Sequence, residues 1–365
     1  MKTPSFQYES LPSRVVFGAG AIARLPEEAD RLRMQRILVV STAGQRKLAA
    51  RVEGLLASRA VGTFSNAAMH TPREITDAAS AQAEDLRVDG IVAVGGGSAI
   101  GLSKALALRT DLPQIVVPTT YAGSEATSIL GETVANEKIT QRSAKVLPET
   151  IVYDVELTIG LPMSVSMASG LNAIAHAVEA LYAPDRNPLT NAMAETALGA
   201  LIDALPEIHE RSDNLEARSK ALWGAWLSGC CLGVTTMGLH HKLCHTLGGT
   251  LGLPHAETHA VVLPHVLDYN LSQAPEAHRT LSRLWTDPDP ARALAEFICR
   301  LGLPTTLSAL GMPAHAIDRV ADLAVSKPYP NPRPLERGPL RDLLAHAWAD
   351  GFPLNRSMKD MNARL

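Results

Sequence analysis

The stretch that decides the fold is residues 91–98, which read Ile91-Val92-Ala93-Val94-Gly95-Gly96-Gly97-Ser98. An apolar run is followed here at once by three glycines and a serine. Two further apolar runs, 37–40 and 115–117, lie in the first 160 residues, and Gly, Ser, Thr or Pro flank each of them. Short apolar runs separated by helical segments are typical of strands buried on both faces of a parallel sheet. We therefore predict a doubly wound, mostly parallel α/β domain over residues 1–160.

The second half of the chain has a different pattern. From about Leu161 the strand signal ends, and apolar residues recur at helical spacing in 163–182, 189–205, 216–234, 291–301 and 315–326. We predict an all-α domain over residues 161–365 that carries the substrate and catalytic groups. The Pro-rich stretch 327–334 also contains polar residues, and we expect it to form an ordered loop.

Charge and cysteine content exclude several classes of function. The 365 residues carry 34 basic and 37 acidic side chains, so a net charge of −3 offers no field that would hold nucleic acid. No apolar run approaches the roughly 20 residues of a membrane span, and the N-terminus lacks the apolar region of a signal peptide. We expect a cytoplasmic protein without nucleic-acid or membrane partners. The four cysteines form no CxxC pair, which argues against a disulfide framework or a zinc–thiolate site: Cys230, Cys231, Cys244 and Cys299.

The glycine run 95–97 is a candidate phosphate cradle. Glycines let the backbone approach a ligand closely, and the N–H groups that open the next helix (expected over 99–108) attract a diphosphate. Such a turn also closes ordinary βα units without a ligand. A second polar loop, residues 118–127, follows the apolar run 115–117. Two such loops at one edge of a parallel sheet favour a nucleotide site. The predicted coenzyme-binding residues are Ser41, Gly95, Gly96, Gly97, Ser98, Thr119, Thr120 and Ser124.

The coenzyme preference is read from the residues after Val40. The acidic residue that usually binds an adenosine ribose is absent, because the chain continues Ser41-Thr42-Ala43-Gly44. No fixed charge would therefore repel a 2′-phosphate, and we expect weak discrimination between NADH and NADPH.

Six of the 12 histidines lie between residues 240 and 265. If a helix covers 235–246, His241 and His245 lie one turn apart on one face, and His255 can return from a loop after Pro254. Asn172 and His176 have the same spacing on a helix upstream. Imidazoles in this arrangement suit a divalent transition metal, or they act without metal as hydrogen-bond donors and acids.

Together these motifs resemble the iron-containing alcohol dehydrogenase family over essentially the whole chain. The resemblance rests on Phe17-Gly18-Ala19-Gly20, the glycine run, Pro118-Thr119-Thr120, residues 170–176 and the histidines from His241 to His265. It implies the fold shared with dehydroquinate synthases, a nicotinamide dinucleotide on the first half and a homodimer. In that family one aspartate and three histidines hold a metal. His176, His241 and His255 match the three histidines, and His245 matches a cleft histidine that is not a ligand.

Two departures from the family pattern bear on the metal. Asn172 stands where the family has its aspartate, and three imidazoles with an amide supply no charge to offset a dication. The loop Tyr121-Ala122-Gly123-Ser124-Glu125 is one residue shorter than usual. Both departures, and residues 329–334, resemble the maleylacetate-reducing branch of the family, whose members generally work without a metal. We therefore expect no bound metal.

The resemblance to this branch implies hydride transfer from NADH or NADPH to a C=C bond of a dicarboxylate substrate. We predict that His241 and His245 polarise the substrate or donate the proton, while the substrate contacts Asn172, His176, His255, Tyr121 and Tyr329. Lys242 and Arg333 are the nearest cations by sequence for the two carboxylates. Three alternatives stay open: a metal-dependent alcohol or polyol dehydrogenase in which Asn172 is a ligand, a nucleotide-binding protein without activity, and a lyase that uses NAD transiently.

Overall fold

The computed structural model describes residues 5–135 and 137–354, which divide into two compact units. The sheet unit comprises residues 9–162 and 213–222, and the helical unit contains the rest. The division after Pro162 lies close to the domain boundary expected at residues 160/161. In addition, residues 213–222 belong to the sheet unit, and the segment that ends at Tyr8 belongs to the helical unit.

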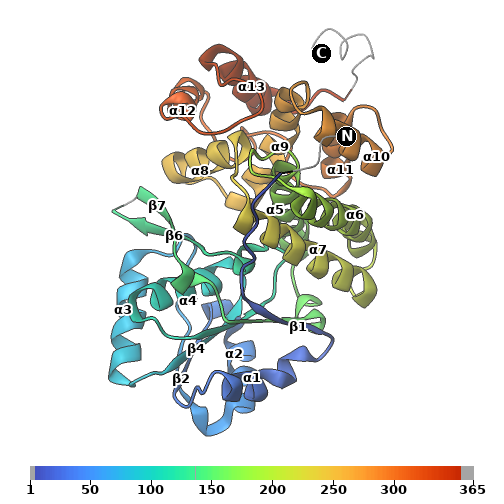
Figure 1. Cartoon of the computed structure of the whole chain (residues 1–365). Coiled ribbons are helices and arrows are strands. Elements are labelled where there is room, and N and C mark those ends of the chain that lie inside the picture. The colour runs from blue at the N-terminus through green and yellow to red at the C-terminus, as the bar shows by residue number, and fades with distance from the viewer. Residues whose placement is uncertain (1–4, 136, 355–365) are drawn as a thin grey trace. The chain divides into compact units, whose positions relative to one another are not determined.

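The sheet unit is built on six parallel strands in the order β1-β8-β5-β4-β2-β3. Helices α1 and α2 lie on one face of this sheet and α3 and α4 on the other (Figure 1). The predicted doubly wound parallel fold is thereby confirmed. The bounds are β1 Arg14–Gly18, α1 Leu25–Arg31, β2 Ile37–Val40, α2 Arg46–Leu56, β3 Ala60–Phe64, α3 Arg73–Asp85, β4 Gly90–Gly95, α4 Gly97–Thr110, β5 Gln114–Pro118 and β8 Thr150–Asp154.

The apolar runs predicted as strands are the centre of this sheet. They correspond to β2, β4 and β5, in which every residue is buried. Strands β1 and β3 at the two edges are only partly buried. An antiparallel hairpin, β6 (Ile129–Val134) with β7 (Glu137–Arg142), follows β5 and was not predicted.

The strand order places a switch point between β2 and β4. From β2 the chain moves outward to β3, and from β4 it moves the opposite way to β5 and β8. Ligands of open α/β sheets bind at the carboxyl edge where the direction reverses. The loops that leave β2 and β4 at this edge are residues 41–45 and 95–96.

The helical unit is organised around α5 (Met163–Ala180), in which every residue from Ser166 to Ala180 is buried. Small residues make this possible: a Cβ on Gly170 would lie 2.5 Å from Cδ2 of Leu205 on α6. The predicted helices are all present. The other bounds are α6 Pro188–Glu210, α7 Leu215–Val234, α8 Leu239–Leu251, α9 His255–Leu271, α10 Pro275–Trp285, α11 Pro290–Arg300, α12 Ala316–Val325 and α13 Arg337–Ala349.

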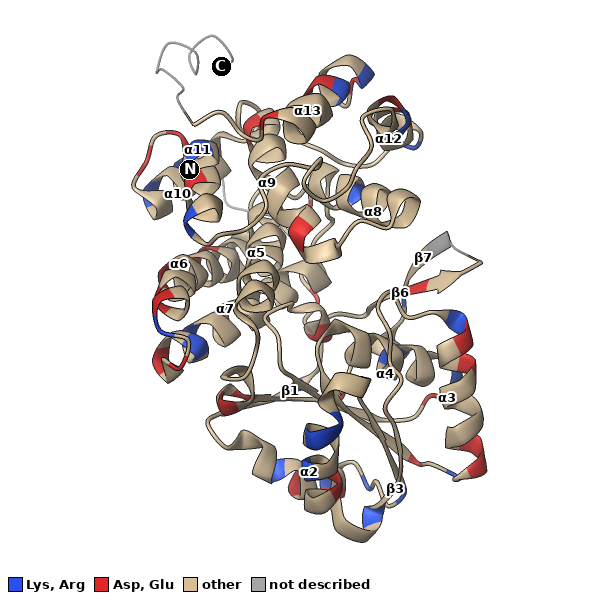
Figure 2. Cartoon of the chain, turned by 180° about the vertical axis from the view of Figure 1, so that it is seen from behind, with Lys and Arg blue, Asp and Glu red and all other residues tan. Residues whose placement is uncertain are grey.

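Charged side chains are concentrated on the peripheral helices. Figure 2 shows acidic and basic residues of both signs along α2, α3 and α13. Helix α5 carries one charged residue, Glu179, and α8 carries one, Lys242. In the part of the chain that the structure describes, no single helix is long and apolar enough to cross a membrane. The bent pair α7 and α8, at 95° to one another, passes that test by length and composition alone.

Candidate active site

The loop after β4 presents backbone at the carboxyl edge of the sheet. Gly95 has a φ of 145°, which L side chains rarely adopt, and a Cβ there would lie 2.3 Å from Oε1 of Gln45. A Cβ on Gly96 would lie 2.8 Å from Cγ2 of Thr120, whereas a Cβ on Gly97 would meet nothing within 4 Å. Gly96 caps α4 without a side-chain acceptor. Open space therefore faces the first turn of α4, where backbone N–H groups can bind a phosphate.

Gln45 joins the three loops at this edge. It follows β2, and its Nε2 donates to Oγ1 of Thr119 in the loop after β5 at 2.9 Å. The N–H of Thr119 in turn donates to the carbonyl of Gly95 at 3.0 Å. These bonds fix the shape of the glycine loop. Gln45 was not predicted, because a single amide in a helical turn carries no recognisable motif.

Three of the predicted coenzyme residues form hydrogen bonds to other residues of the sheet unit. The hydroxyl of Ser41 is buried and donates to Oγ of Ser65 at 3.1 Å, and Oγ1 of Thr119 accepts from Gln45. The carbonyl of Ser124 accepts from Nζ of Lys104. These bonds shape the loops, and contact of the three residues with the coenzyme stays a prediction. The predicted residues that are exposed or half-buried are Gly96, Gly97, Ser98, Thr120 and Ser124.

A buried lysine anchors the loop after β5. Nζ of Lys104 on α4 donates to the carbonyls of Ser124, Thr127 and Ile129 at 2.6, 2.8 and 3.1 Å. Burial lowers the pKa of Lys104 to about 7, and the nearby charge of Glu125 opposes this shift. Nζ of Lys104 thus holds residues 124–129 against α4.

The helical unit assembles the predicted histidines from three helices. Asn172 and His176 lie one turn apart on α5, and His241 and His245 one turn apart on α8, as the spacing predicted. His255 was expected in a loop, but the loop ends at Pro254 and His255 is the first residue of α9. The rings of His176 and His241 are 4.9 Å apart, and those of His245 and His255 are 6.2 Å apart.

A buried carboxylate at the start of α8 binds one of these rings. Gly238, the N-cap of α8, has no side chain that could accept a hydrogen bond. Glu179 of α5 accepts instead from the N–H groups that the helix leaves unbonded at its start. Its Oε1 accepts from the N–H of His240 at 2.9 Å, and its Oε2 accepts from the N–H of Gly238 at 3.1 Å. Oε2 also lies 2.6 Å from Nδ1 of His241.

The second nitrogen of His241 is bound as well. Its Nε2 lies 2.8 Å from Nδ1 of His176. Both ring nitrogens of His241 are therefore used inside the helical unit, and the ring is only 5% exposed. In this geometry both nitrogens of His241 have partners within the helical unit, and its catalytic role stays a prediction. The half-buried imidazoles of the cluster are His245 and His255.

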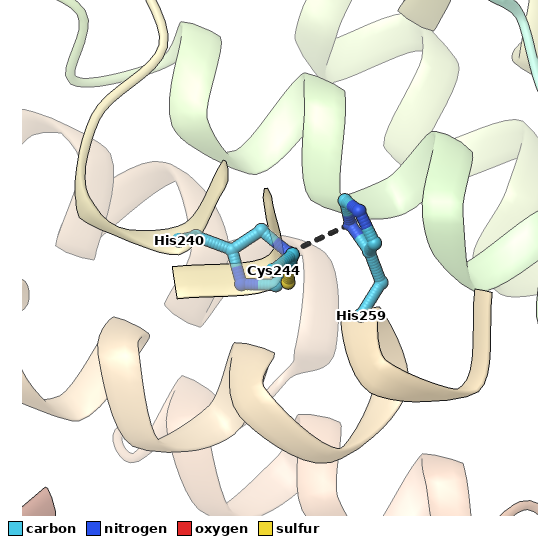
Figure 3. Close-up of side chains that lie close together, drawn as sticks. All are labelled: His240, Cys244 and His259. Carbon is cyan, nitrogen blue, oxygen red and sulfur yellow. Dashed lines mark hydrogen bonds between the residues drawn. The ribbon is translucent and has the colours of Figure 1, made fainter. Parts of the chain in front are cut away.

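A second group of side chains lies beside the hydrogen-bonded residues Glu179, His241 and His176, and it was not predicted. Figure 3 shows His240 and Cys244 one turn apart on α8, facing His259 of α9. The ring nitrogens Nε2 of His240 and Nδ1 of His259 are 2.9 Å apart, and Sγ of Cys244 is 3.7 Å from the former. Two nitrogen ligands of one tetrahedral ion would be about 3.3 Å apart, so the 2.9 Å separation is a hydrogen bond. Burial lowers the pKa of both histidines, which keeps them neutral.

The remaining predicted substrate contacts have different environments. Tyr121 belongs to the sheet unit, is fully buried and accepts a hydrogen bond from Nη1 of Arg218 at 2.9 Å. It supports that unit from within, and its contact with the substrate stays a prediction. Tyr329 lies in the Pro-rich loop of the helical unit. Burial raises the pKa of its hydroxyl, and the charge of Glu179 adds to this shift.

Arg333 and Lys242, the cations expected to bind the substrate, both lie in the helical unit. The guanidinium of Arg333 stacks on the ring of Tyr269, 4.2 Å from its centroid, and Nη1 donates to the Tyr269 carbonyl at 3.4 Å. The neighbouring Asn331 forms a reciprocal amide pair with Asn270, with bonds of 2.7 and 3.1 Å. The loop is thereby fixed to α9, as expected of an ordered loop. Lys242 is half-buried on α8.

Comparison with known proteins agrees with this architecture. Residues 12–155 match the model for iron-containing alcohol dehydrogenase, and residues 166–348 match the C-terminal model of the Fe-containing alcohol dehydrogenase family. The chain belongs to the iron-containing alcohol dehydrogenase family and is an oxidoreductase with a nucleotide-binding domain.

Within the family, the chain is similar to maleylacetate reductases. It is 52% identical over 344 residues to the maleylacetate reductase of Burkholderia cepacia, covering 94% of this chain and 98% of that protein. The crystal structure of maleylacetate reductase from Agrobacterium tumefaciens matches with a TM-score of 0.93 at 50% identity, over 96% of this chain and 100% of that one. The enzyme from Rhizobium sp. strain MTP-10005 matches with a TM-score of 0.92 at 48% identity, over 96% and 100%. The predicted resemblance to this branch is confirmed.

Proposed function

We propose that this chain reduces the C=C bond of maleylacetate to give 3-oxoadipate, with NADH or NADPH as the hydride donor, in the breakdown of aromatic compounds. The similarity to maleylacetate reductases over 94% of the chain supports the substrate. The glycine loop and the open first turn of α4 support a dinucleotide.

The proposed reaction places negative charge on an oxygen atom. Hydride adds to the alkene carbon β to the ketone, the π electrons shift, and the carbonyl oxygen becomes an enolate. Protonation of the α-carbon then completes the product, and the coenzyme leaves in its oxidised form. His245 is half-buried on α8 and its ring contacts His241 and His255. We assign it the N–H that stabilises the enolate oxygen, as a donor in an oxyanion hole does.

We further propose that this reaction needs no bound metal. The observation that carries this is the bond between Nδ1 of His176 and Nε2 of His241, at 2.8 Å. Two of the three histidines at the family's ligand positions bind each other, and the fourth position is the neutral Asn172. As arranged, these residues do not fit a dication. An enolate spreads its charge over several atoms, so hydrogen bonding can take the part that a Lewis acid takes for an alkoxide.

Two observations favour a metal-dependent alcohol dehydrogenase as the second candidate. Oδ1 of Asn172 is buried and accepts no hydrogen bond from the residues that the structure describes. In addition, a carboxylate such as Glu179 behind a histidine is a common partner of metal-ligating histidines. A metal would require the rings of His176 and His241 to separate.

An absorbance assay at the reduced-coenzyme band separates the candidates. The purified protein is treated with a chelator, dialysed, and given maleylacetate or a simple aldehyde with NADH or NADPH. We expect coenzyme oxidation with maleylacetate, unchanged by chelation and by added Fe²⁺ or Zn²⁺. Activity lost on chelation and restored by either ion supports the second candidate. No oxidation with any carbonyl compound means that the protein binds a nucleotide without catalysis.

A further inference from the structure

We infer that Glu179 is a positioning residue that fixes the protonated nitrogen of His241 and, through it, that of His176. Four N–H groups converge on this one carboxylate: the backbone donors of Gly238, His240 and His241 and the ring donor of His241. Glu179 is 1% exposed and His241 5% exposed, so water does not screen the arrangement. Every one of these partners donates, which matches a carboxylate that only accepts.

The direction of each hydrogen bond follows from this acceptor. Because the Glu179 carboxylate only accepts, Nδ1 of His241 carries the proton in the 2.6 Å bond. With this single N–H on the ring of His241, its Nε2 is an acceptor. The 2.8 Å bond to His176 then requires the proton on Nδ1 of His176. One carboxylate thus sets the tautomers of two rings.

Gly238 gives the carboxylate the room that this needs. A Cβ at this position would lie 3.2 Å from Oε1 of Glu179, from Oδ1 of Asn331 and from the carbonyl of Pro330. The glycine therefore lets α5, the start of α8 and the Pro-rich loop approach one another. His240, the other ring on this turn, binds His259 instead and does not compete for Glu179.

The test compares Glu179→Met with Glu179→Gln. Methionine removes the acceptor for Nδ1 of His241 at similar size. Glutamine keeps one oxygen, which we expect to face the three donors on Oε2, and loses mainly the bond to the N–H of His240. Proteins with ¹⁵N-labelled histidine are examined by long-range ¹H–¹⁵N correlation, and the His241 signals are identified by their absence in His241→Asn. Glu276→Gln, at an exposed ion pair with Arg186, is the matched control.

We expect wild type, Glu179→Gln and the control to show His241 protonated at Nδ1 and His176 protonated at Nδ1. Glu179→Met loses this pattern in both rings. Unchanged tautomers in folded Glu179→Met overturn the inference. If Glu179→Met does not fold, the wild-type spectrum still decides, because His241 protonated at Nε2 contradicts the assignment.

A second test measures kinetics, and it alone rests on the proposed function. With maleylacetate, kcat of Glu179→Met should fall by about tenfold to hundredfold, as for other residues that orient active-site histidines. KM should change by less than about twofold, and Glu179→Gln should recover most of the loss. A purely structural role predicts unchanged kcat per folded molecule. If the wild type does not reduce maleylacetate, the proposed function fails while the spectra still test the inference.

Discussion

Replacement of Gly95 by alanine tests whether the glycine loop is built by backbone constraint. The φ of 145° is strained for any L side chain, at about 1–3 kcal/mol. The new Cβ would also lie 2.3 Å from Oε1 of Gln45, so that side chain must move and give up its bond to Thr119, worth about 0.5–1.5 kcal/mol. The two contributions together predict a loss of about 2–4 kcal/mol in the free energy of unfolding.

Gly97→Ala is the matched comparison, because a Cβ there meets nothing within 4 Å. Its unfolding free energy should stay within about 1 kcal/mol of wild type. If a diphosphate approaches the first turn of α4, the added methyl group should nevertheless raise the Kd for NADH about tenfold or more, equivalent to about 1.4 kcal/mol. Urea unfolding followed by circular dichroism and NADH fluorescence titration measure the two effects. Wild-type NADH affinity in Gly97→Ala, or wild-type stability in Gly95→Ala, would refute the reasoning.

Three other changes give separate tests. His245→Ala should lower kcat about a hundredfold or more, since an oxyanion donor contributes about 2.7–4 kcal/mol; a loss under about fivefold in the maleylacetate assay removes it from the mechanism. Native Lys104 has a pKa of about 7 against an ordinary 10.5, so between these pH values the unfolded chain holds a proton that the native state lacks. The unfolding free energy of wild type should therefore rise with pH by up to about 1.4 kcal/mol per pH unit more than that of Lys104→Met. Urea unfolding at pH 7.5 and at pH 9.5 measures this; an equal change with pH in the two proteins contradicts the assignment. Gly238→Ala should displace Glu179 and lower kcat about tenfold at unchanged coenzyme affinity; wild-type turnover would show that the 3.2 Å contacts relax freely.

The central strands could be predicted because burial on both faces leaves a continuous apolar run. Strands β2, β4 and β5 have this property, and each was found within a residue or two of its bounds. Edge strands β1 and β3 are partly exposed, and Gly62 interrupts the apolar residues of β3. Strand β8 is fully buried and has the short apolar run Ile151-Val152-Tyr153, but it was not predicted. The hairpin of β6 and β7 is similarly mixed in character.

The site could be predicted as a set of positions but not as a set of bonds. The i, i+4 spacings of Asn172 with His176 and of His241 with His245 correctly placed these residues on helix faces. Spacing cannot show which ring nitrogen binds which partner, so the bonds of His241 to Glu179 and His176 could not be predicted. Glu179 had one signal that went unused: it is the single charged residue in an otherwise uncharged, buried helix of 18 residues.

The bond between His176 and His241 has a consequence for how the protein becomes active in a cell. A centre that depends on an ion must be loaded after folding and stays idle when that ion is scarce. Here Nδ1 of His176 on α5 and Nε2 of His241 on α8 bind each other as soon as the two helices pack together. Under the proposed metal-independent reaction, catalytic capacity should follow the amount of folded chain and remain constant in cells starved of iron or zinc.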